Sequence, residues 1–445
     1  QNRIGVGRKT VAIYGRQRNE EGLGEGAWGP GTIDEDGRLL EHDEDVLVMM
    51  ARHLVKLGFN VEVYINLPAG QSGMDKHGVM WRPFYALHGM LPPVWNETHV
   101  LWPKYPVDKQ PDVYISWRNL EAAHLFNSSV YQAKNLTPPV SYLWLTNLIN
   151  KPHILTPKFT GPLHGIITNS YFQAAIMPRR IQSCLLISRV AVEQEPPYSI
   201  RQVENSNFRF LYAGHPLAGL DIALEAWPDI RRQIAAKVPG GESAKLQVIF
   251  APDDQLDLQY QEHKWYQNLK TRIYHLLEQD GVEYRPKLSL RKIARAFVSA
   301  GFYLHPAWRP EASSVHLVKA QIHGAIPITS RNPYSSLNET CGEFDMGPTP
   351  QEGHSSEDSQ YVQRWVGSVV AAATMPRESL QLRRESMIAQ SRQRFHFKYI
   401  ADEWAVLFRR HIALGANATC GNSTEQVVQQ RDPSEKPTSA NKEEL

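Results

Sequence analysis

One carboxylate in the second half of the chain stands where α/β proteins often bind ligands. The apolar run 302–305 predicts a strand, and Pro306, Glu311 and the small residues 312–314 follow it before a helical pattern that ends at Gly324. Small residues let backbone N–H groups at a helix start approach an anion closely, which suits a diphosphate. A neighbouring carboxylate can accept hydrogen bonds from sugar hydroxyls. The pattern therefore predicts a site for a phosphorylated sugar.

The same spacing also fits a purely structural role. Ser313 or Ser314 would then cap the helix through its side chain, and Glu311 would lie in solvent. Spacing alone favours this capping interpretation, so the choice depends on the rest of the sequence.

The elements that must position these residues alternate between strands and helices. Short apolar runs separated by amphipathic segments are typical of α/β layers with parallel sheets. The segment 191–207 contains Pro196-Pro197 and few apolar residues, so we interpret it as a linker between two such series. Strands are predicted at 10–14, 60–65, 112–117, 140–145, 165–168, 208–213, 245–250, 282–284, 302–305 and 326–330, and helices at about 46–57, 220–235, 264–279, 290–300, 314–323 and 397–410.

Further candidates follow strands of the first series. Open parallel sheets bind ligands beyond the carboxyl ends of their strands, and two such sheets can face each other across a cleft. Gly15 and the turn Trp28-Gly29-Pro30 follow the first strand, and Asn147 follows the strand at 140–145. Gly15 leaves room for an acceptor or a donor sugar. Trp28 either stacks on a pyranose ring or packs its own long loop onto the domain.

Four segments resemble the retaining glycosyltransferase family 4. Residues 303–330 resemble its donor-site signature, which reads aromatic-Pro-x-x-x-E-small and ends in E-A-x-A-x-G-x-P-V. Residues 211–221, Leu-Tyr-Ala-Gly-His-Pro-Leu-Ala-Gly-Leu-Asp, resemble the first turn of its second domain. Residues 51–61 fit its first helix, and residues 395–404 resemble its closing helix. The chain is thereby identified as a divergent, eukaryotic-type luminal member.

The resemblance implies an α/β protein of the GT-B fold, with two Rossmann-like parallel-sheet domains that face each other across a cleft. Residues 1–195 are expected to form the first domain, on the acceptor side, and residues 196–395 the second, on the nucleotide-sugar side. A crossover helix at 396–412 would pack on the first domain, and 413–445 would be a disordered tail.

The resemblance also implies transfer of a sugar from a nucleotide diphosphate to a glycan, lipid or protein acceptor. It implies no cofactor beyond the nucleotide-sugar co-substrate and no obligatory metal. Glu311 is the expected catalytic residue, since it would bind the transferring sugar. The expected donor-binding residues are Gly214, His215, Arg309, Ala312, Ser313, Ser314, Val315 and Lys319, and the expected acceptor-side residues are Gly15, Trp28, Gly29 and Asn147.

Two functional positions depart from the family pattern. Lys319 stands eight residues after Glu311, where family members carry a second glutamate that holds the nucleotide ribose. Ala218 stands where they carry an arginine or lysine that neutralises the leaving diphosphate, a charge that Lys319 could replace. The alternative function is a catalytically degenerate GT-B protein that binds glycans or acts as a partner subunit. A sugar epimerase or phosphorylase is a third class, and no residue points to it.

Composition narrows the possible partners. The net charge of +2 gives no reason to invoke nucleic acid or a charged membrane surface. No apolar run reaches the roughly 18 residues that span a bilayer. The chain begins at Gln1, so a leader or anchor can precede it.

Several features favour a glycoprotein of the endoplasmic-reticulum lumen. The last four residues, Lys-Glu-Glu-Leu, differ from the KDEL retrieval signal by one methylene. The three cysteines neither support nor exclude this compartment, because their odd number leaves at least one unpaired, and a Cys341–Cys420 bridge is one conceivable pairing. N-glycosylation sequons, of which about two are expected by chance, stand at Asn96, Asn127, Asn135, Asn338, Asn417 and Asn422.

Overall fold

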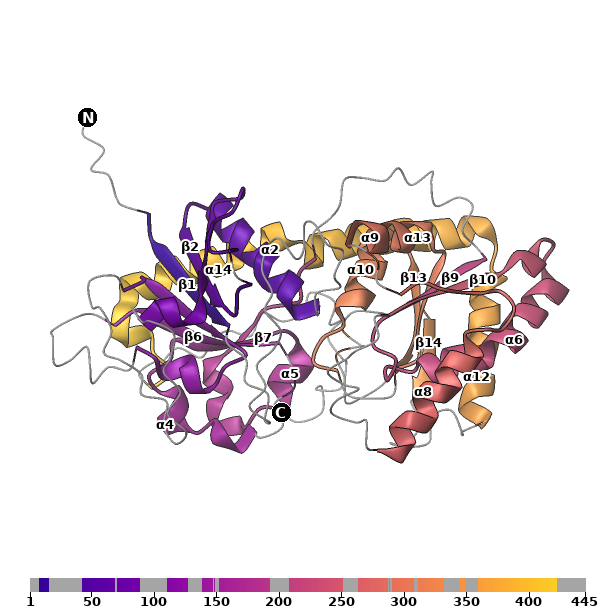
Figure 1. The fold of residues 1–445 in the computed structure, drawn as a ribbon, viewed down its shortest axis with the longest axis horizontal. Helices are drawn as coiled ribbons and strands as arrows, with labels where there is room; N and C mark the ends of the chain where they lie inside the picture. The colour runs from indigo at the N-terminus through magenta and orange to yellow at the C-terminus, as the bar shows by residue number, and fades with distance from the viewer. Residues whose placement is uncertain are drawn as a thin grey trace, which may run out of the picture.

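The protein forms two α/β domains that lie side by side, and its last helices return from the second domain to the first (Figure 1). The computed structural model describes residues 8–15, 42–68, 70–88, 110–126, 138–146, 148, 152–192, 208–250, 263–286, 288, 290–307, 311–331, 336, 339, 344–348 and 359–421.

The first domain is built on an eight-stranded sheet in the order β3-β4-β2-β1-β5-β6-β7-β8. Its neighbouring strands are parallel, except that β3 and β4 are antiparallel. The central strands are apolar on both faces, as expected for a parallel sheet that helices cover on both sides. The bounds are β1 Thr10–Gly15, β2 Asn60–Ile65, β3 Gly73–Met74, β4 Val79–Pro83, β5 Val113–Trp117, β6 Val140–Leu145, β7 Gly165–Thr168 and β8 Leu185–Ile187.

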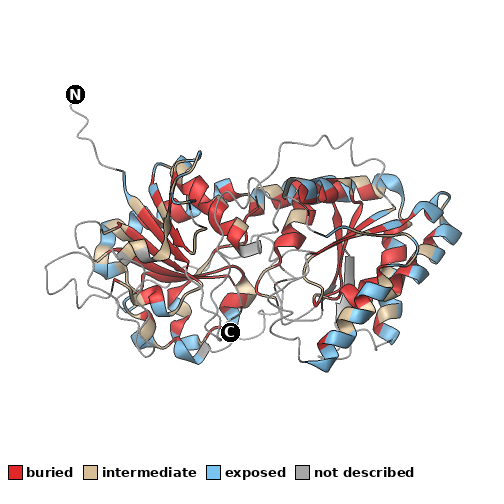
Figure 2. Ribbon diagram, in the orientation of Figure 1, coloured by how far each residue is buried: buried red, intermediate tan, exposed pale blue. Residues whose placement is uncertain are grey.

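The second domain is built on a six-stranded parallel sheet in the order β11-β10-β9-β12-β13-β14. Figure 2 shows that the central strands of both sheets are buried, whereas exposed residues lie on the outward faces of the helices. The bounds are β9 Arg209–Ala213, β10 Lys245–Ile249, β11 Val282–Tyr284, β12 Phe302–His305, β13 Ile326–Arg331 and β14 Phe344–Pro348.

Helices connect most of these strands, and three long helices complete the chain. The α-helices are α2 His42–Lys56, α4 Pro157–Thr160, α5 Tyr171–Ala175, α6 Leu220–Lys237, α8 Lys264–Leu276, α9 Leu290–Ser299, α10 Val315–His323, α12 Ser359–Ala373, α13 Arg377–Phe395 and α14 Phe397–Leu414. Short 3-10 helices lie at Phe84–His88, Glu121–His124, Pro152–Ile154, Arg179–Cys184, Gly241–Ser243 and Gly415–Ala418.

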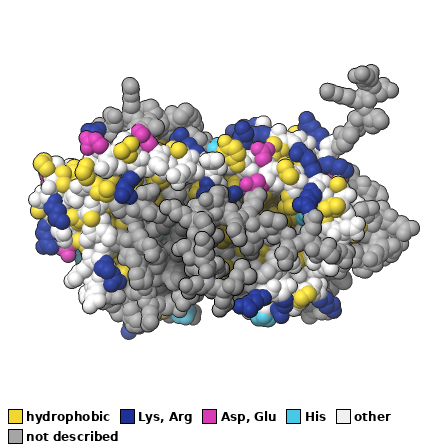
Figure 3. Space-filling model, turned by 180° about the vertical axis from the view of Figure 1, so that it is seen from behind, with side chains coloured by type: hydrophobic (Ala, Val, Ile, Leu, Met, Phe, Trp, Pro, Cys, Tyr) yellow, Lys and Arg dark blue, Asp and Glu magenta, His cyan; other side chains and the backbone are white. Residues whose placement is uncertain are grey.

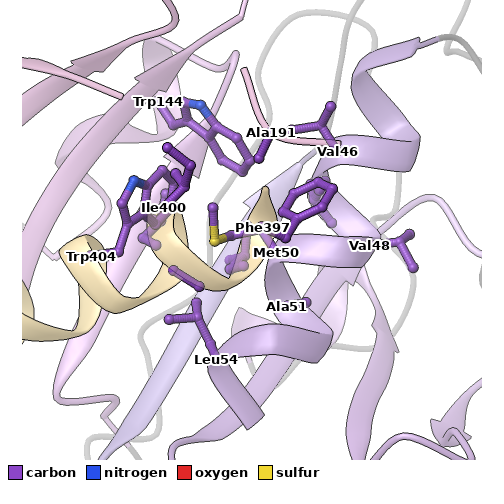
Figure 4. Close-up of a cluster of buried hydrophobic side chains, with 14 of the residues drawn as sticks. Val46, Val48, Met50, Ala51, Leu54, Trp144, Ala191, Phe397, Ile400 and Trp404 are labelled. Carbon is purple, nitrogen blue, oxygen red and sulfur yellow. The ribbon is translucent and has the colours of Figure 1, made fainter. Parts of the chain in front are cut away.

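The crossover helix α14 belongs to the core of the first domain. Its residues Phe397 and Trp404 pack among apolar side chains of α2 and β6 (Figure 4). The Trp404 indole lies 4.8 Å from the ring of Trp144 in an edge-to-face arrangement. Its Nε1–H donates a 2.7 Å hydrogen bond to Ser188 Oγ, so the one polar atom of this buried ring is satisfied.

A half-buried histidine contacts the first domain at the far end of α14. The Tyr142 hydroxyl and His411 Nδ1 are 2.7 Å apart. Burial raises the pKa of Tyr142, and burial lowers the pKa of His411 to about 4, with the neighbouring His164 adding to the decrease. The phenol is therefore protonated and the imidazole neutral near neutral pH, so the phenol donates and the ring nitrogen accepts.

The chain beyond α14 is attached to the first domain, contrary to the predicted tail. Residues 415–418 form a 3-10 helix, and Cys420 N–H donates to Leu163 O at 2.7 Å. Cys420 forms a disulfide with Cys184, whose Cα lies 5.2 Å away. The prediction of disorder from residue 413 is thus wrong for 413–421, and the conceivable Cys341–Cys420 pairing is replaced by Cys184–Cys420.

The predicted order of strands and helices is confirmed, and the structure adds elements that were not predicted. These are the edge strands β3, β8 and β14, the strand β4 between β3 and β2, and the helices α12 and α13. None of the helices within the described ranges has the length and apolarity that a membrane span requires. Lysines and arginines are spread over both domains on the face shown in Figure 3.

Replacing Trp404 should detach the crossover helix. Trp404→Ala removes a ring that is 3% exposed, together with its hydrogen bond, and should lower the free energy of unfolding by about 3–5 kcal/mol. Val406→Ala on the same helix is the control, because Val406 is 65% exposed and its loss should cost less than about 0.5 kcal/mol. Urea unfolding followed by circular dichroism measures both values. Equal losses would contradict the packing described here.

Candidate functional site

The predicted site residues lie at the carboxyl ends of strands in both sheets. Gly15 ends β1 in the first domain, Gly214 follows β9, and Glu311 follows β12 in the second. Helix α10 begins just after Glu311, and its residues Val315 and Val318 belong to the core cluster of the first domain. The start of α10 therefore lies at the junction of the two domains.

Glu311 is held by a histidine from the strand that precedes it. His305 Nε2 lies 3.3 Å from the Glu311 carboxylate, and His305 Nδ1 lies 3.4 Å from the Tyr303 hydroxyl. That hydroxyl donates to Ala213 O at 2.7 Å, so it can only accept from Nδ1. Burial, reinforced by the Glu311 charge, raises the pKa of Tyr303 and keeps the phenol protonated. Polar contacts thus run from Ala213 through Tyr303 and His305 to the Glu311 carboxylate.

The Ser314 side chain does not cap the start of α10. Ser314 occupies the N-cap position in an extended conformation and makes no side-chain capping hydrogen bond. Ser314 is 6% exposed, and the Glu311 side chain is only 20% exposed. The capping interpretation is therefore wrong for Ser314, and Glu311 does not lie free in solvent.

The loop after β9 packs closely against this helix start. A Cβ on Gly214, which has a φ of +152°, would lie 3.4 Å from His316 Nδ1. A Cβ on Gly219, which has a φ of +91°, would lie 2.2 Å from Pro306 O. Glycine at position 219 thus lets the β9 loop approach the β12 loop, whereas at position 214 the contact would be an ordinary one and it is the positive φ that favours glycine. His215 Nδ1 accepts the Leu217 N–H at 3.0 Å within the same loop.

Lys319 forms an ion pair between the two domains. Its Nζ donates to Asp45 Oδ2 of α2 at 3.0 Å, and the two side chains are only 13% and 16% exposed. The ammonium therefore faces the first domain in this structure. The role of Asp45 as the partner of Lys319 was not predicted from the sequence.

A second carboxylate also joins the domains. Glu339, from the chain after β13, accepts the backbone N–H groups of Tyr171 and Phe172 at 2.9 and 2.6 Å. These N–H groups open helix α5, where the Ser170 side chain accepts a further hydrogen bond from Gln173 N. Sequence reasoning missed Glu339, because a glutamate in a loop carries no signal of a distant partner.

Gly15 serves packing within the first domain. A Cβ at this position would lie 2.7 Å from the Trp117 ring and 3.1 Å from Ile65. The small residue is thus needed by its own sheet. The neighbouring Arg118 has a φ of +57° and places its guanidinium 5.2 Å from the centre of the Trp117 ring.

The structure brings Gly214, Ala312, Ser313, Ser314, Val315 and Lys319 together around the start of α10. The predicted site residues Arg309, Trp28, Gly29 and Asn147 lie outside the described residues, as do the sequons at Asn96, Asn127, Asn135, Asn338 and Asn422. Asn417 is described and exposed, in the 3-10 helix that follows α14. Within the described ranges, no group of three or more His, Cys, Asp or Glu side chains could hold a metal ion.

The interdomain ion pair should contribute measurably to closure of the domains. A double-mutant cycle with Asp45→Asn and Lys319→Met should give a coupling of about 1–3 kcal/mol in the free energy of unfolding, because both partners are largely buried. The pair Lys245–Glu283 is a suitable control, since it is 2.7 Å long but exposed, and its coupling should stay below about 1 kcal/mol. Equal couplings would show that the interdomain position adds nothing.

No protein-family profile matches the chain, and no curated protein sequence matches it. Solved structures do match. A glycosyltransferase from Rickettsia africae is 13% identical over 91% of this chain and 98% of its own, with a TM-score of 0.55.

Two further solved structures match over similar lengths. Trehalose 6-phosphate synthase from Burkholderia multivorans is 12% identical over 91% and 99% of the two chains, with a TM-score of 0.57. HepE from Anabaena, in complex with UDP and glucose, is 11% identical over 91% and 100%, with a TM-score of 0.53. The fold shared with these glycosyltransferases is GT-B: two parallel-sheet domains with a C-terminal helix that crosses back to the first.

Proposed function

We propose that this protein is a retaining glycosyltransferase that moves a sugar from a nucleotide-diphosphate donor to a glycan, lipid or protein. The observation that carries the proposal is Glu311, held by His305 beside a helix start that Ser314 leaves uncapped, at the junction of the domains. The complexes of HepE with UDP and with UDP-glucose support a nucleotide sugar as the donor class. Retention of configuration and membership of family 4 rest on the resemblance of residues 303–330.

The donor diphosphate would bind at the start of α10. Backbone N–H groups at a helix start point toward a ligand there, and the helix dipole favours negative charge. Negative charge grows on the departing diphosphate in the transition state, and fixed donors stabilise it without having to reorganise. Glu311 would accept hydrogen bonds from hydroxyls of the transferring sugar, and His305 would keep its carboxylate oriented.

Lys319 has two conceivable contributions in this proposal. It can supply positive charge to the diphosphate only after it leaves Asp45, which is 3.0 Å away. While paired, it instead stabilises the closed arrangement of the domains around the donor. The paired arrangement is the one observed, so we assign Lys319 to closure.

A catalytically degenerate GT-B protein is the second candidate, and Lys319 with Ala218 is the reason to keep it. Lys319 places an ammonium where family members use a carboxylate to hold the ribose. Ala218 is uncharged, whereas family members carry an arginine or lysine at this position. Such a protein would bind glycans or a catalytic partner through the same interdomain surface.

Nucleotide binding and the Glu311 carboxylate together test the transferase. Titration calorimetry should detect at least one common nucleoside diphosphate. With the corresponding nucleotide sugar, Glu311→Gln should reduce turnover about 100-fold or more, because the sugar loses charged hydrogen bonds in the transition state. Glu378→Gln, at an exposed position of α13, should leave turnover unchanged.

Absence of binding by every common nucleoside diphosphate and nucleotide sugar would overturn the transferase. Lys319→Glu combined with Ala218→Arg then tests the degenerate alternative. Gain of nucleotide binding in that double variant would support loss of an ancestral donor site. Damage to an existing activity would show instead that Lys319 and Ala218 belong to a working site.

We also propose that the protein resides in the lumen of the endoplasmic reticulum. A disulfide between Cys184 and Cys420 fits an oxidising compartment. The sequon at Asn417 is exposed, in the 3-10 helix that follows α14, where a glycosylating enzyme can reach it. The C-terminal Lys-Glu-Glu-Leu adds a retrieval-like signal.

The compartment has a direct chemical test. The protein purified from its native source should shift in mobility after treatment with an N-glycosidase, and Asn417→Gln should reduce that shift by one glycan. One free thiol, from Cys341, should react under denaturing conditions without reductant, because the other two cysteines are paired. Three reactive thiols and no mobility shift would contradict a luminal location.

A further inference from the structure

Two histidines join the end of the crossover helix to the sheet of the first domain. His164 lies just before β7, and His411 lies in the last turn of α14. Their ring centres are 6.0 Å apart, and the Tyr142 ring of β6 lies 6.5 Å from His164 and 5.8 Å from His411. His164 is only 7% exposed, so its charge depends on these surroundings more than on solvent.

Backbone groups contact both ring nitrogens of His164. Its Nδ1 accepts the Ser141 N–H at 3.2 Å, and its Nε2 lies 3.2 Å from Gly415 O. A backbone N–H can only donate and a carbonyl can only accept, so these contacts require a neutral ring with its proton on Nε2. A second proton, on Nδ1, would point at the Ser141 N–H and break that hydrogen bond. The charged form of His164 therefore does not fit this position.

The surroundings of the two histidines also disfavour positive charge. Burial lowers the pKa of His164, against a weaker opposing effect of the Gly415 carbonyl. Burial, together with the charges of His164 and Arg410, lowers the pKa of His411 to about 4. Tyr142, the titratable group that faces them from β6, stays protonated because burial raises its pKa. The 3-10 helix that follows α14 has the sequence Gly-Ala-Asn-Ala and adds no charge.

The same histidines hold the chain that follows α14. Residues 415–421, called the C-terminal segment below, begin at the carbonyl that accepts from His164. Next to His164, Leu163 O accepts the Cys420 N–H at 2.7 Å. The disulfide between Cys420 and Cys184 does not titrate, and it keeps the C-terminal segment tethered when these hydrogen bonds break. Opening at the histidines is therefore local.

We propose that His164 and His411 form an acid-sensitive attachment: when neutral they hold the C-terminal segment and the end of α14 on the first domain, and when protonated they release them. In the open state both histidines reach solvent and titrate near their ordinary 6.5. The open state then binds more protons than the closed one, so acid favours opening as the pH falls from 6.5 to about 4. This attachment is independent of the proposed transferase activity.

Hydrogen exchange of the full chain, at about pH 7.5 and about pH 5 and corrected for the intrinsic rate at each pH, measures this opening. From the His411 pKa of about 4 against the ordinary 6.5, the open fraction of the C-terminal segment should rise about 20-fold or more at the lower pH. Peptides from α6, in the second domain, should keep their protection. Equal loss of protection in both regions would mean general unfolding and would overturn the proposal.

Asparagine variants separate the charge of the histidines from their hydrogen bonds. Asparagine Oδ1 can accept a hydrogen bond as Nδ1 does, and the amide does not titrate. In His164→Asn combined with His411→Asn, opening of the C-terminal segment should be the same at both pH values. His275→Asn is the matched control, because His275 is exposed on α8, and it should keep the wild-type response. A double variant that responds to acid as strongly as wild type would contradict the attachment.

His411→Asn alone keeps the test available if the double variant does not fold. This single variant retains His164 with both of its backbone contacts. Its response to acid should be about tenfold or more below that of wild type, because the share that His411 supplies is removed. An unchanged response would exclude His411 from the attachment and overturn the proposal as stated.

Discussion

The structure depends on helix α10 being shared by the two domains. The helix follows a strand of the second sheet, yet Val315, Val318 and Ile322 pack into the core of the first domain. Burial of these side chains fixes where the helix start can lie. Each fully buried aliphatic side chain stabilises the folded state by about 1.5–3 kcal/mol relative to an exposed one. The backbone N–H groups that would bind a ligand at the start of α10 are therefore positioned by a hydrophobic contact with the first domain. The proposed ligand site and the domain junction thus coincide.

The polar contacts at this junction have a common character. Lys319 with Asp45, and Glu339 with the start of α5, each join a charged group of one domain to a group of the other. Such contacts carry directional information that apolar packing lacks. They set how the second domain is rotated on the first, whereas the apolar side of α10 holds the domains together. Both carboxylates lie within a few residues of strand or helix ends, where backbone N–H groups and cationic side chains are exposed to the junction.

The central strands and helices could be predicted because each has a local pattern of apolar residues. The buried strands are continuous apolar runs, and residues 303–330 combine strand, turn and helix start in one stretch. The edge strands β3 and β14 were not predicted. Strand β3 has only two residues, and the sequence of β14, Phe-Asp-Met-Gly-Pro, shows no alternation of apolar and polar residues. Helix α13 is rich in charged residues on most of its surface, and its buried Arg384 is satisfied by the carbonyl of Gly324, a partner 60 residues away.

The candidate site was predicted in part for the same reason. Glu311 and the small residues after it are neighbours in sequence, so their proximity could be inferred. Asp45 and Glu339 meet the site only through the arrangement of the domains, and no neighbouring residue in the chain indicates these contacts. The pairing of Cys420 with Cys184 is a similar long-range contact, at a separation of 236 residues.

The two places where the chain passes between domains are themselves side by side. Val192 N–H donates to Phe395 O at 2.8 Å, and Val192 forms a parallel bridge with His396. The second domain is thus an insertion whose two ends nearly touch. Any relative movement must pivot where these two segments meet, so opening is a rotation rather than a separation. A gene that joins residue 192 to residue 396 through a few glycines would therefore encode the first domain as one continuous chain.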